Sequence, residues 1–189
     1  ASPIQSVILN NEEKTGISFM RMSLGMDEGD ILQSHELNLD KSWNKTQLES
    51  QLSALSISKI SSLLNQINND ELSYTKQDSD MATYCKKINK GDSLINFKTS
   101  SNEVLNKFKA FNEWPGISFI YKEKLIKIHN LFEEETNSEV APGEIISFTK
   151  GGLSIKTDDS SIVITHLQFP NKNIISSNDA FNSHREFFK

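Results

Sequence analysis

Hydrophobic residues recur at two different spacings along this chain, and the change of spacing constrains its fold more than any other feature. Between residues 46 and 67 they recur every three to five positions, which places them on one face of a helix. From Ile117 onward the period changes to two, as in strands that bury one face. The 189 residues therefore predict two unlike parts, an α/β part followed by a β part.

The first part begins with one short helix and two extended segments. A helix is predicted from Pro3 to about Asn10. Ser2 is its expected cap, because the proline that follows it fits the first turn of a helix. A strand is predicted at Ile17–Met22 and a second extended segment at 31–37. Too few strands are present here to close a sheet.

A long amphipathic helix follows, capped by Asn44 or Thr46 and ended by the polar residues 68–70. Its apolar positions share one face, and we expect that face to pack in the core. They are Leu48, Leu52, Leu55, Ile60, Leu63 and Ile67. The polar stretch after the helix is typical of a connector, so we divide the chain into residues 1–70, a linker 71–94 and a second domain 95–189.

The second domain is predicted to begin with a helix over about 101–112, which Pro115 stops. Five short strands follow, separated by glycine- or aspartate-containing turns, and a last helix over about 179–188 is capped by Ser177 or Asn178. The predicted strands are 117–121, 124–131, 144–149, 153–157 and 161–169. This pattern indicates a small barrel or sandwich.

The loop Gly16–Asp30 is the most suggestive local feature, since a strand leads into a turn with carboxylates at Asp27, Glu28 and Asp30. A carboxylate at the end of a strand has a fixed position and is open to a substrate, although turns also collect glycine and aspartate for purely structural reasons.

Bulk composition narrows the class of protein. The net charge is −5. The first 94 residues hold 9 basic and 13 acidic residues, and the remaining residues hold 11 basic and 12 acidic ones. The chain therefore lacks the overall basic charge that is typical of a nucleic-acid binder. No apolar run is long enough to span a membrane, and no signal peptide is visible. One cysteine, Cys85, is typical of a reducing compartment, which predicts a cytoplasmic protein.

Several short motifs, in order along the whole chain, resemble the methionyl-tRNA formyltransferase family. The segments Thr15–Met20 and Gly25–Asp30 resemble the loop around its catalytic aspartate, and Thr83-Tyr84 with Lys86-Lys87-Ile88 resembles its linker. Ala110–Gly116 is similar to the signature that opens its C-terminal domain. Each motif alone is weak, but their order and spacing agree.

This resemblance implies the C-terminal part of a Rossmann-like formyltransferase domain followed by a C-terminal β-barrel of oligonucleotide-binding type. The family transfers a formyl group from 10-formyltetrahydrofolate to the α-amine of methionyl-initiator tRNA and uses no metal. Its catalytic aspartate maps to Asp27, within an active-site loop that includes Gly25, Met26 and Gly29. The family's Asn-x-His pair matches none of the four histidines here, so the chain is expected to be inactive alone.

Lysines are the candidate contacts to tRNA phosphates. One departure from the family is Lys109, which replaces an arginine and loses its two-pronged hydrogen bonding; Glu113 replaces a proline. The family implies initiator tRNA as partner, no DNA, no membrane and a monomeric full enzyme, whereas an open strand edge in the fragment predicts dimers. The candidate lysines are Lys86, Lys87, Lys90, Lys109, Lys122, Lys124, Lys127 and Lys172.

Two alternatives stay open at this point. The chain could be a non-catalytic RNA-binding remnant, or part of a formyltransferase or hydrolase of the same superfamily with another acceptor, such as an amino-sugar nucleotide. The linker and the Ala110–Gly116 signature favour the tRNA enzyme.

Overall fold

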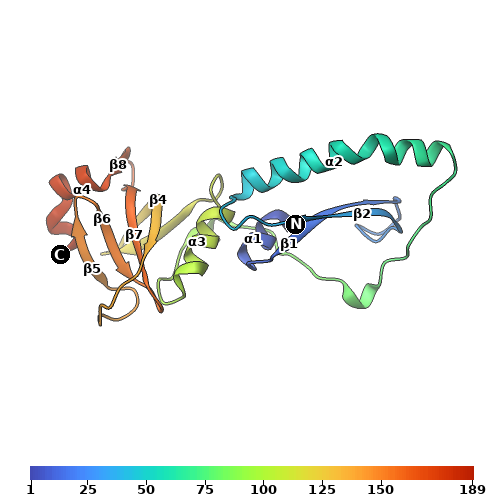
Figure 1. Cartoon of the computed structure of the whole chain (residues 1–189). Helices are drawn as coiled ribbons and strands as arrows, with labels where there is room; N and C mark the ends of the chain where they lie inside the picture. The colour runs from blue at the N-terminus through green and yellow to red at the C-terminus, as the bar shows by residue number, and fades with distance from the viewer. The chain divides into compact units, whose positions relative to one another are not determined.

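The computed structural model describes all 189 residues, which form two compact units, Ala1–Lys87 and Ile88–Lys189 (Figure 1). No helix in the chain is both long and apolar enough to cross a membrane.

The first unit has the predicted order of helix, strand, strand and helix. Helix α1 spans Pro3–Leu9, and strands β1 (Lys14–Met20) and β2 (Ile31–Asn38) form an antiparallel pair. Strand β1 begins earlier and ends earlier than predicted, because the residue after Met20 already belongs to the closed loop described below. Alternate β1 residues are half-buried and exposed, as expected for a sheet with one covered face. The two-stranded sheet is extended only by an isolated bridge between Ile31 and Thr75.

Ser2 does not act as the side-chain cap of α1 that its position predicts. Its hydroxyl donates to the carbonyl oxygen of Lys86 at 2.5 Å, and its side-chain oxygen accepts no hydrogen bond from α1. The first turn of α1 is thereby tied to the end of the first unit instead of being capped locally.

Helix α2 (Lys45–Asn68) is the long helix that the periodicity predicts. Asn44 caps it through a reciprocal pair of hydrogen bonds with Gln47, each 2.9 Å long. The expectation that its whole apolar face is core is wrong at its C-terminal half, where Ile60 and Ile67 are 37% and 45% exposed. A helix of 24 residues is about 36 Å long, whereas strands of seven or eight residues span only about 26 Å.

The second unit opens with a short 3₁₀ turn, η2 (Lys90–Ser93), and helix α3 (Ser101–Ala110). All five predicted strands are present: β3 (Ile117–Tyr121), β4 (Lys124–Glu134), β5 (Ile145–Thr149), β6 (Gly152–Lys156) and β7 (Ser161–Gln168). A sixth strand, β8 (Ile174–Ser176), was not predicted.

The six strands form an open antiparallel sheet rather than the closed barrel that the pattern suggests. The order is β3-β4-β7-β6-β5, and β8 pairs with β7 beyond the end of β6. Strands β3 and β5 stand at opposite ends of this order and share no ladder. The outer edge of β3 is partly covered by its own chain, since the backbone N–H of Ile95 donates to the carbonyl oxygen of Ser118 at 2.8 Å.

Helix α4 (Ser177–His184) and the 3₁₀ turn η3 (Arg185–Phe188) replace the single predicted last helix. The cap is Ser176, whose hydroxyl oxygen accepts from the backbone N–H of Asp179 at 3.2 Å, so the helix begins two residues earlier than predicted. The segment packs on an aromatic cluster from the ends of three strands: Tyr121, Phe148 and Phe169 contact Phe181, Phe187 and Phe188.

Candidate functional site

The loop between β1 and β2 holds the candidate catalytic residue Asp27. The loop is closed at its base, where the backbone N–H of Arg21 donates to the carbonyl oxygen of Asp30 at 2.9 Å. Gly29 is buried at this closure, and a Cβ there would stand 1.7 Å from the carbonyl oxygen of Arg21. Glycine is therefore required for the close approach of the two arms.

Asp27 stands at the tip of this loop with a left-handed backbone, φ +60°, and an exposed side chain. Aspartate tolerates this conformation better than most residues. Glu28 is exposed, and its carboxylate occupies the space that a Cβ on Gly25 would need. The loop therefore presents the Asp27 carboxylate outward from a constrained backbone.

Gln77, which sequence reasoning missed, ties the Asp27 loop to a distant segment of the first unit. Its side-chain amide donates to the carbonyl oxygens of Asp27 at 2.8 Å and Gly29 at 2.7 Å. Gln77 follows the bridge between Thr75 and Ile31, which brings this segment alongside β2. No local sequence pattern marks this residue, because its contacts lie about 50 positions away.

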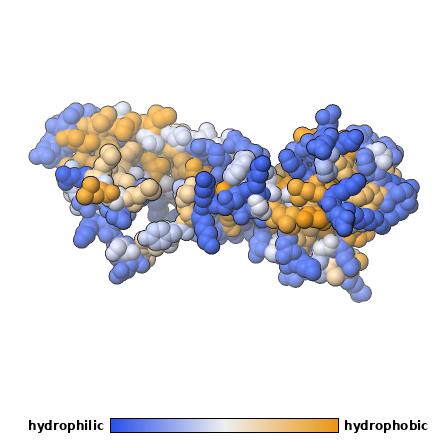
Figure 2. Space-filling model, turned by 180° about the vertical axis from the view of Figure 1, so that it is seen from behind, coloured by the Kyte–Doolittle hydropathy of each residue, from blue (hydrophilic) through white to orange (hydrophobic).

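The loop also exposes large apolar side chains beside the candidate carboxylate. Met22, Leu24 and Met26 are 92%, 110% and 88% exposed, although the surrounding backbone is tied down. Helix α2 adds Ile57 and Leu64 to the exposed apolar residues of the same unit. Hydrophobic residues accordingly cover much of the face of this unit that Figure 2 shows.

The histidines do not gather beside Asp27. His35 contacts Phe19 edge-on and shares a hydrogen bond with Gln33, on the sheet of the first unit. His129 pairs with Gln168 in the second unit at 3.0 Å. The Asp27 carboxylate is thus presented without an imidazole partner from its own unit.

The candidate tRNA lysines are divided between the two units. Lys86 and Lys87 belong to the first unit, and Lys90 begins η2. Lys109 lies in the last turn of α3, and Lys127 faces Gln168 across the pair β4 and β7. The structure brings three of the others to one end of the large sheet: Lys122, Lys124 and Lys172.

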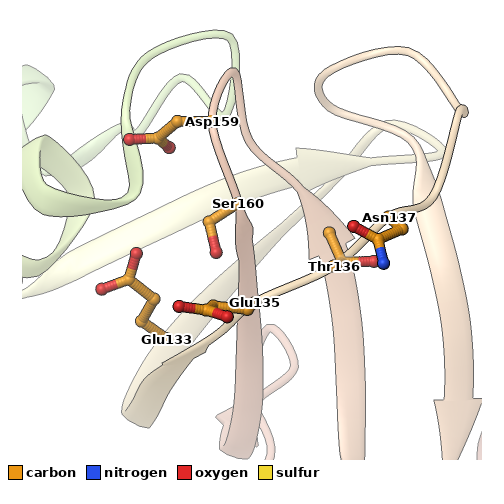
Figure 3. A pocket seen from close by; sticks show the side chains of 6 residues that line it. All are labelled: Glu133, Glu135, Thr136, Asn137, Asp159 and Ser160. Atoms are coloured by element: carbon orange, nitrogen blue, oxygen red, sulfur yellow. The ribbon is translucent and has the colours of Figure 1, made fainter.

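The opposite end of the same sheet carries a polar pocket of about 360 Å³ (Figure 3). Its lining residues are Glu133, Glu135, Thr136, Asn137, Asp159 and Ser160. Three carboxylates make this pocket unsuited to a phosphate.

Asp159 in this pocket has a clear structural task. Its carboxylate accepts from the backbone N–H of Ser101 at 2.8 Å, which satisfies a donor at the start of α3. This hydrogen bond, with smaller help from the Thr157 side chain, lowers the pKa of Asp159. The hydroxyl of Ser101 donates in turn to the carboxylate of Glu133. The pocket is therefore lined by residues that hold the start of α3 against the sheet.

Comparison with known proteins identifies the family of this chain. Residues 87–185 match the family model "Formyl transferase, C-terminal domain", so the chain belongs to the formyl transferase family. Among curated relatives, the chain is 30% identical over 183 residues to the methionyl-tRNA formyltransferase of Legionella pneumophila (strain Corby). That match covers 97% of the chain and 58% of the relative, and it confirms the resemblance to the methionyl-tRNA formyltransferases.

Solved structures show the same fold at lower identity. HypX from Aquifex aeolicus, in complex with tetrahydrofolic acid, has a TM-score of 0.71 at 19% identity, over 100% of this chain and 33% of that one. An N-formyltransferase from Helicobacter canadensis, in complex with folinic acid and dTDP-3-aminofucose, has a TM-score of 0.67 at 20% identity, over 90% of this chain and 61% of that one. The chain thus spans only part of the length of its relatives.

Proposed function

We propose that this chain is the later portion of a cytoplasmic methionyl-tRNA formyltransferase, whose complete form transfers a formyl group from 10-formyltetrahydrofolate to the α-amine of methionyl-initiator tRNA. The observation that carries the proposal is the match to a methionyl-tRNA formyltransferase over 97% of the chain, since it runs through both units. Folate compounds bound in the structures of similar fold support a folate donor.

We assign the Asp27 carboxylate to proton transfer in this reaction. The neutral amine adds to the formyl carbon, and an oxyanion forms on the formyl oxygen. The bond from this carbon to N10 of the folate then breaks, N10 takes up a proton and leaves as tetrahydrofolate, and the attacking amine sheds a proton. An exposed carboxylate on a fixed loop can accept that proton directly or through a water molecule. The asparagine and histidine of the family motif, in the part of the enzyme before Ala1, would stabilise the oxyanion. The chain alone is then expected to be inactive.

Gln77 serves this chemistry as a positioning residue in the proposal. Two hydrogen bonds from its amide fix the backbone on both sides of Glu28, at Asp27 and at Gly29. A loop held in this way presents the Asp27 carboxylate in one place, and fixed placement of a catalytic group is a large part of rate enhancement.

A second candidate function keeps the chemistry and changes the acceptor. The fold similarity to an N-formyltransferase crystallised with dTDP-3-aminofucose favours an amino-sugar nucleotide as that acceptor. Its amine would be formylated by the same attack on the formyl carbon. The second unit would then need no surface for RNA.

A direct acceptor assay separates these functions. The complete protein is incubated with 10-formyltetrahydrofolate and either methionyl-initiator tRNA or dTDP-3-aminofucose, and formylated product is measured. We expect product with the charged tRNA and none with uncharged tRNA, the matched control that lacks the amine. Formylation of the sugar nucleotide alone would establish the second function. No product with either acceptor would favour a non-catalytic remnant that binds RNA.

A further inference from the structure

One arginine stands at the base of the loop that carries Asp27. Arg21 directly follows β1, and it is the only lysine or arginine between Lys14 and Lys41. Of the 20 lysines and arginines in the chain 18 are lysines, so composition does not account for an arginine at this position. A guanidinium differs from an ammonium because it is planar, offers its donors as a fork that fits a phosphate, and stacks on aromatic rings.

Both the backbone and the side chain of Arg21 are held in place. Its backbone N–H donates to the carbonyl oxygen of Asp30 at 2.9 Å, the hydrogen bond that closes the loop. Its guanidinium lies 5.7 Å from the ring centre of Tyr74, within the range of a cation–π contact. The ring belongs to a fixed segment, because Thr75 exchanges two backbone hydrogen bonds with Ile31, of 2.8 and 2.9 Å. Tyr74 therefore supports one face of the guanidinium.

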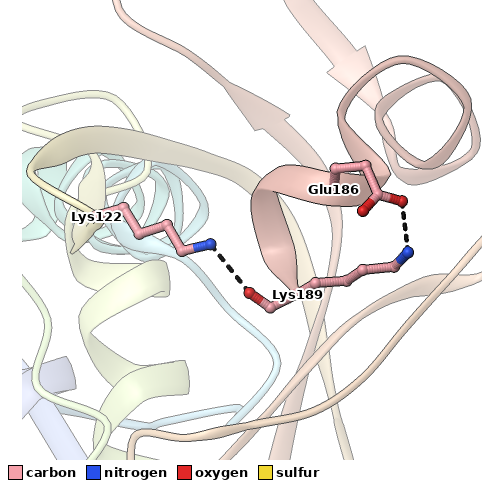
Figure 4. Close-up of polar contacts among 3 residues, drawn as sticks. All are labelled: Lys122, Glu186 and Lys189. Atoms are coloured by element: carbon pink, nitrogen blue, oxygen red, sulfur yellow. Dashed lines mark hydrogen bonds and ion pairs between the residues drawn. The ribbon is translucent and has the colours of Figure 1, made fainter.

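The hydrogen-bond donors of this guanidinium are free, unlike those of ordered cations in the second unit. There Lys189 pairs with Glu186, and the ammonium of Lys122 donates to the carbonyl oxygen of Lys189 at 3.0 Å (Figure 4). Arg21 is exposed, and its side chain forms no ion pair and no hydrogen bond, although three carboxylates belong to its own loop. An ordered side chain with free donors loses little entropy when it binds an anion.

Arg21 and Asp27 belong to one small area of the surface. Arg21 is paired with Asp30, and the three residue steps from Asp30 to Asp27 span at most about 11 Å. The segment that supplies Tyr74 also supplies Gln77, whose amide donates to the carbonyl oxygen of Asp27 at 2.8 Å. One segment thus supports both the guanidinium and the catalytic loop, so a substrate that reaches the Asp27 carboxylate comes close to Arg21.

The charge of the loop makes such a cation useful to a phosphorylated substrate. Asp27, Glu28 and Asp30 are the acidic residues of the loop, and Arg21 is its only cation. Carboxylates repel a phosphate that approaches them, and a neighbouring cation offsets that repulsion. Both acceptors considered above carry phosphate. In charged tRNA it is attached to the ribose that bears the methionyl ester, and in dTDP-3-aminofucose it is attached to the amino sugar.

We propose that Arg21 binds a phosphate group of the acceptor, with Tyr74 supporting its guanidinium, while Asp27 receives the proton of the amine. The inference rests on the proposed function in taking a formyl acceptor as the ligand of this loop, and it holds for either acceptor. The planar fork can donate two parallel hydrogen bonds to one phosphate. The competing anions are the carboxylates of the folate donor.

Equilibrium binding of the acceptor to the complete protein, without formyl donor, tests this site. The ligands are methionyl-initiator tRNA and dTDP-3-aminofucose, and the effect is measured on whichever binds more tightly. Arg21→Gln removes the charge and the fork, Arg21→Lys keeps only the charge, and Tyr74→Leu removes only the ring. The control Lys14→Gln removes an exposed charge at the opposite end of β1.

We expect Arg21→Gln to raise the Kd of the acceptor about tenfold at 0.1 M salt, as for the loss of hydrogen bonds to a charged group. With tRNA the salt slope should fall by about one, because one phosphate contact is lost. Arg21→Lys and Tyr74→Leu should each raise Kd about threefold, and the control less than twofold. Thermal unfolding checks that all four variants fold.

Two kinetic measurements identify the anion that Arg21 binds. Adenosine esterified with methionine is the end of charged tRNA without its phosphate, and 3-aminofucose is the corresponding part of the sugar nucleotide. Arg21→Gln should leave kcat/KM for the phosphate-free acceptor within about twofold of normal, whereas a merely structural role would lower it as much as for the whole acceptor. The KM for 10-formyltetrahydrofolate should also stay within about twofold.

The proposal is overturned by an unchanged Kd in Arg21→Gln, by an equal rise in the control, by an equal loss with the phosphate-free acceptor, or by no binding of either acceptor. A raised KM for the folate with a normal Kd for the acceptor would assign Arg21 to the folate carboxylates instead. Formyl transfer together with a normal Kd in Arg21→Gln refutes this site alone. A raised Kd in Arg21→Gln, in a protein that transfers no formyl group, refutes the proposed function and keeps the site.

Discussion

The two units differ sharply in how much of their apolar side-chain area they bury. In the second unit 19 apolar residues are buried, against three in the first, which are Ile8, Leu48 and Leu63. The lengths of the units, 87 and 102 residues, do not account for this difference. The second unit packs a six-stranded sheet against two helices, whereas the first combines only two strands with one long and one short helix. Two paired strands packed against helices are close to the minimum that can fold in water.

This contrast matters for function, because the candidate catalytic loop belongs to the thinly packed unit. The position of Asp27 depends on a few hydrogen bonds to backbone carbonyl oxygens of its loop rather than on a surrounding core. The donors are the backbone N–H of Arg21 and the side-chain amide of Gln77. The candidate lysines Lys122 and Lys124 belong to the well-packed unit, where strand ends and an aromatic cluster hold them. Changes in the two units should therefore have different kinds of effect.

The largest effect is expected in the core of the second unit. Ile164 on β7 is fully buried, and Ile164→Ala should lower the free energy of unfolding of that unit by about 3 kcal/mol, since the truncation leaves a cavity. The matched change is Ile57→Ala on α2, where Ile57 is 73% exposed. It should change the free energy of unfolding by less than about 0.5 kcal/mol. Urea unfolding followed by circular dichroism measures both. Similar losses in the two variants would break the contrast between the units.

Gly29→Ala should have the next largest effect, and it should be local. The new Cβ meets the carbonyl oxygen of Arg21, so the arms of the loop must separate at a cost of about 2 kcal/mol. Hydrogen exchange should become faster in residues 21–30 and stay unchanged in the second unit. Gly91→Ala is the control, because nothing lies within 4 Å of its added Cβ. Unchanged exchange in Gly29→Ala would contradict the closed-loop description.

Gln77→Ala should loosen the same loop by about 1 to 2 kcal/mol, through the loss of two hydrogen bonds. In the complete enzyme the change should lower kcat more than it raises KM, because Gln77 positions the loop without touching a substrate. Gln51→Ala, an exposed change on α2, is the control. An equal effect of both changes on kcat and KM would contradict the positioning role of Gln77.

Asp159→Asn should have the smallest effect, and that effect should depend on pH. The folded-state pKa of Asp159 is lowered by the Ser101 N–H, so its charged form stabilises the fold above the unfolded-state pKa of about 3.9. The contribution is lost as pH falls through the lowered pKa. Asparagine keeps an acceptor oxygen but loses the charge, so the variant should be less stable at pH 7 by under about 1 kcal/mol. Thermal unfolding from pH 7 to pH 3 should show the two proteins converging; a constant difference would contradict this cause.

Local patterns were sufficient to predict much of the second unit. Alternation and turn residues identified five strands, since both signals act over a few neighbouring positions. Strand β8 was missed because three residues carry no periodicity. The cap of α4 was placed late because Ser176 and Ser177 are chemically equivalent in sequence, and only the fold selects the first.

Contacts across the chain limited the prediction of the first unit and of the sites. The periodicity of α2 identified a helix, but the burial of Ile60 and Ile67 depends on what lies against them, which spacing does not encode. The hydrogen bonds of Gln77 and the contact between Lys122 and Lys189 arise between distant segments of the chain. The strand-to-loop pattern that pointed to Asp27 is local and could be found from sequence.

The rate of formyl transfer by the complete protein carrying Asp27→Asn tests the central claim most directly. Methionyl-initiator tRNA and 10-formyltetrahydrofolate are mixed with excess enzyme in a single turnover, beside Glu28→Gln as the neighbouring control. The account predicts a rate at least about 100-fold below that of the unchanged protein, within the range lost with a general acid or base, and a nearly normal rate for the control. A nearly normal rate for Asp27→Asn would contradict it.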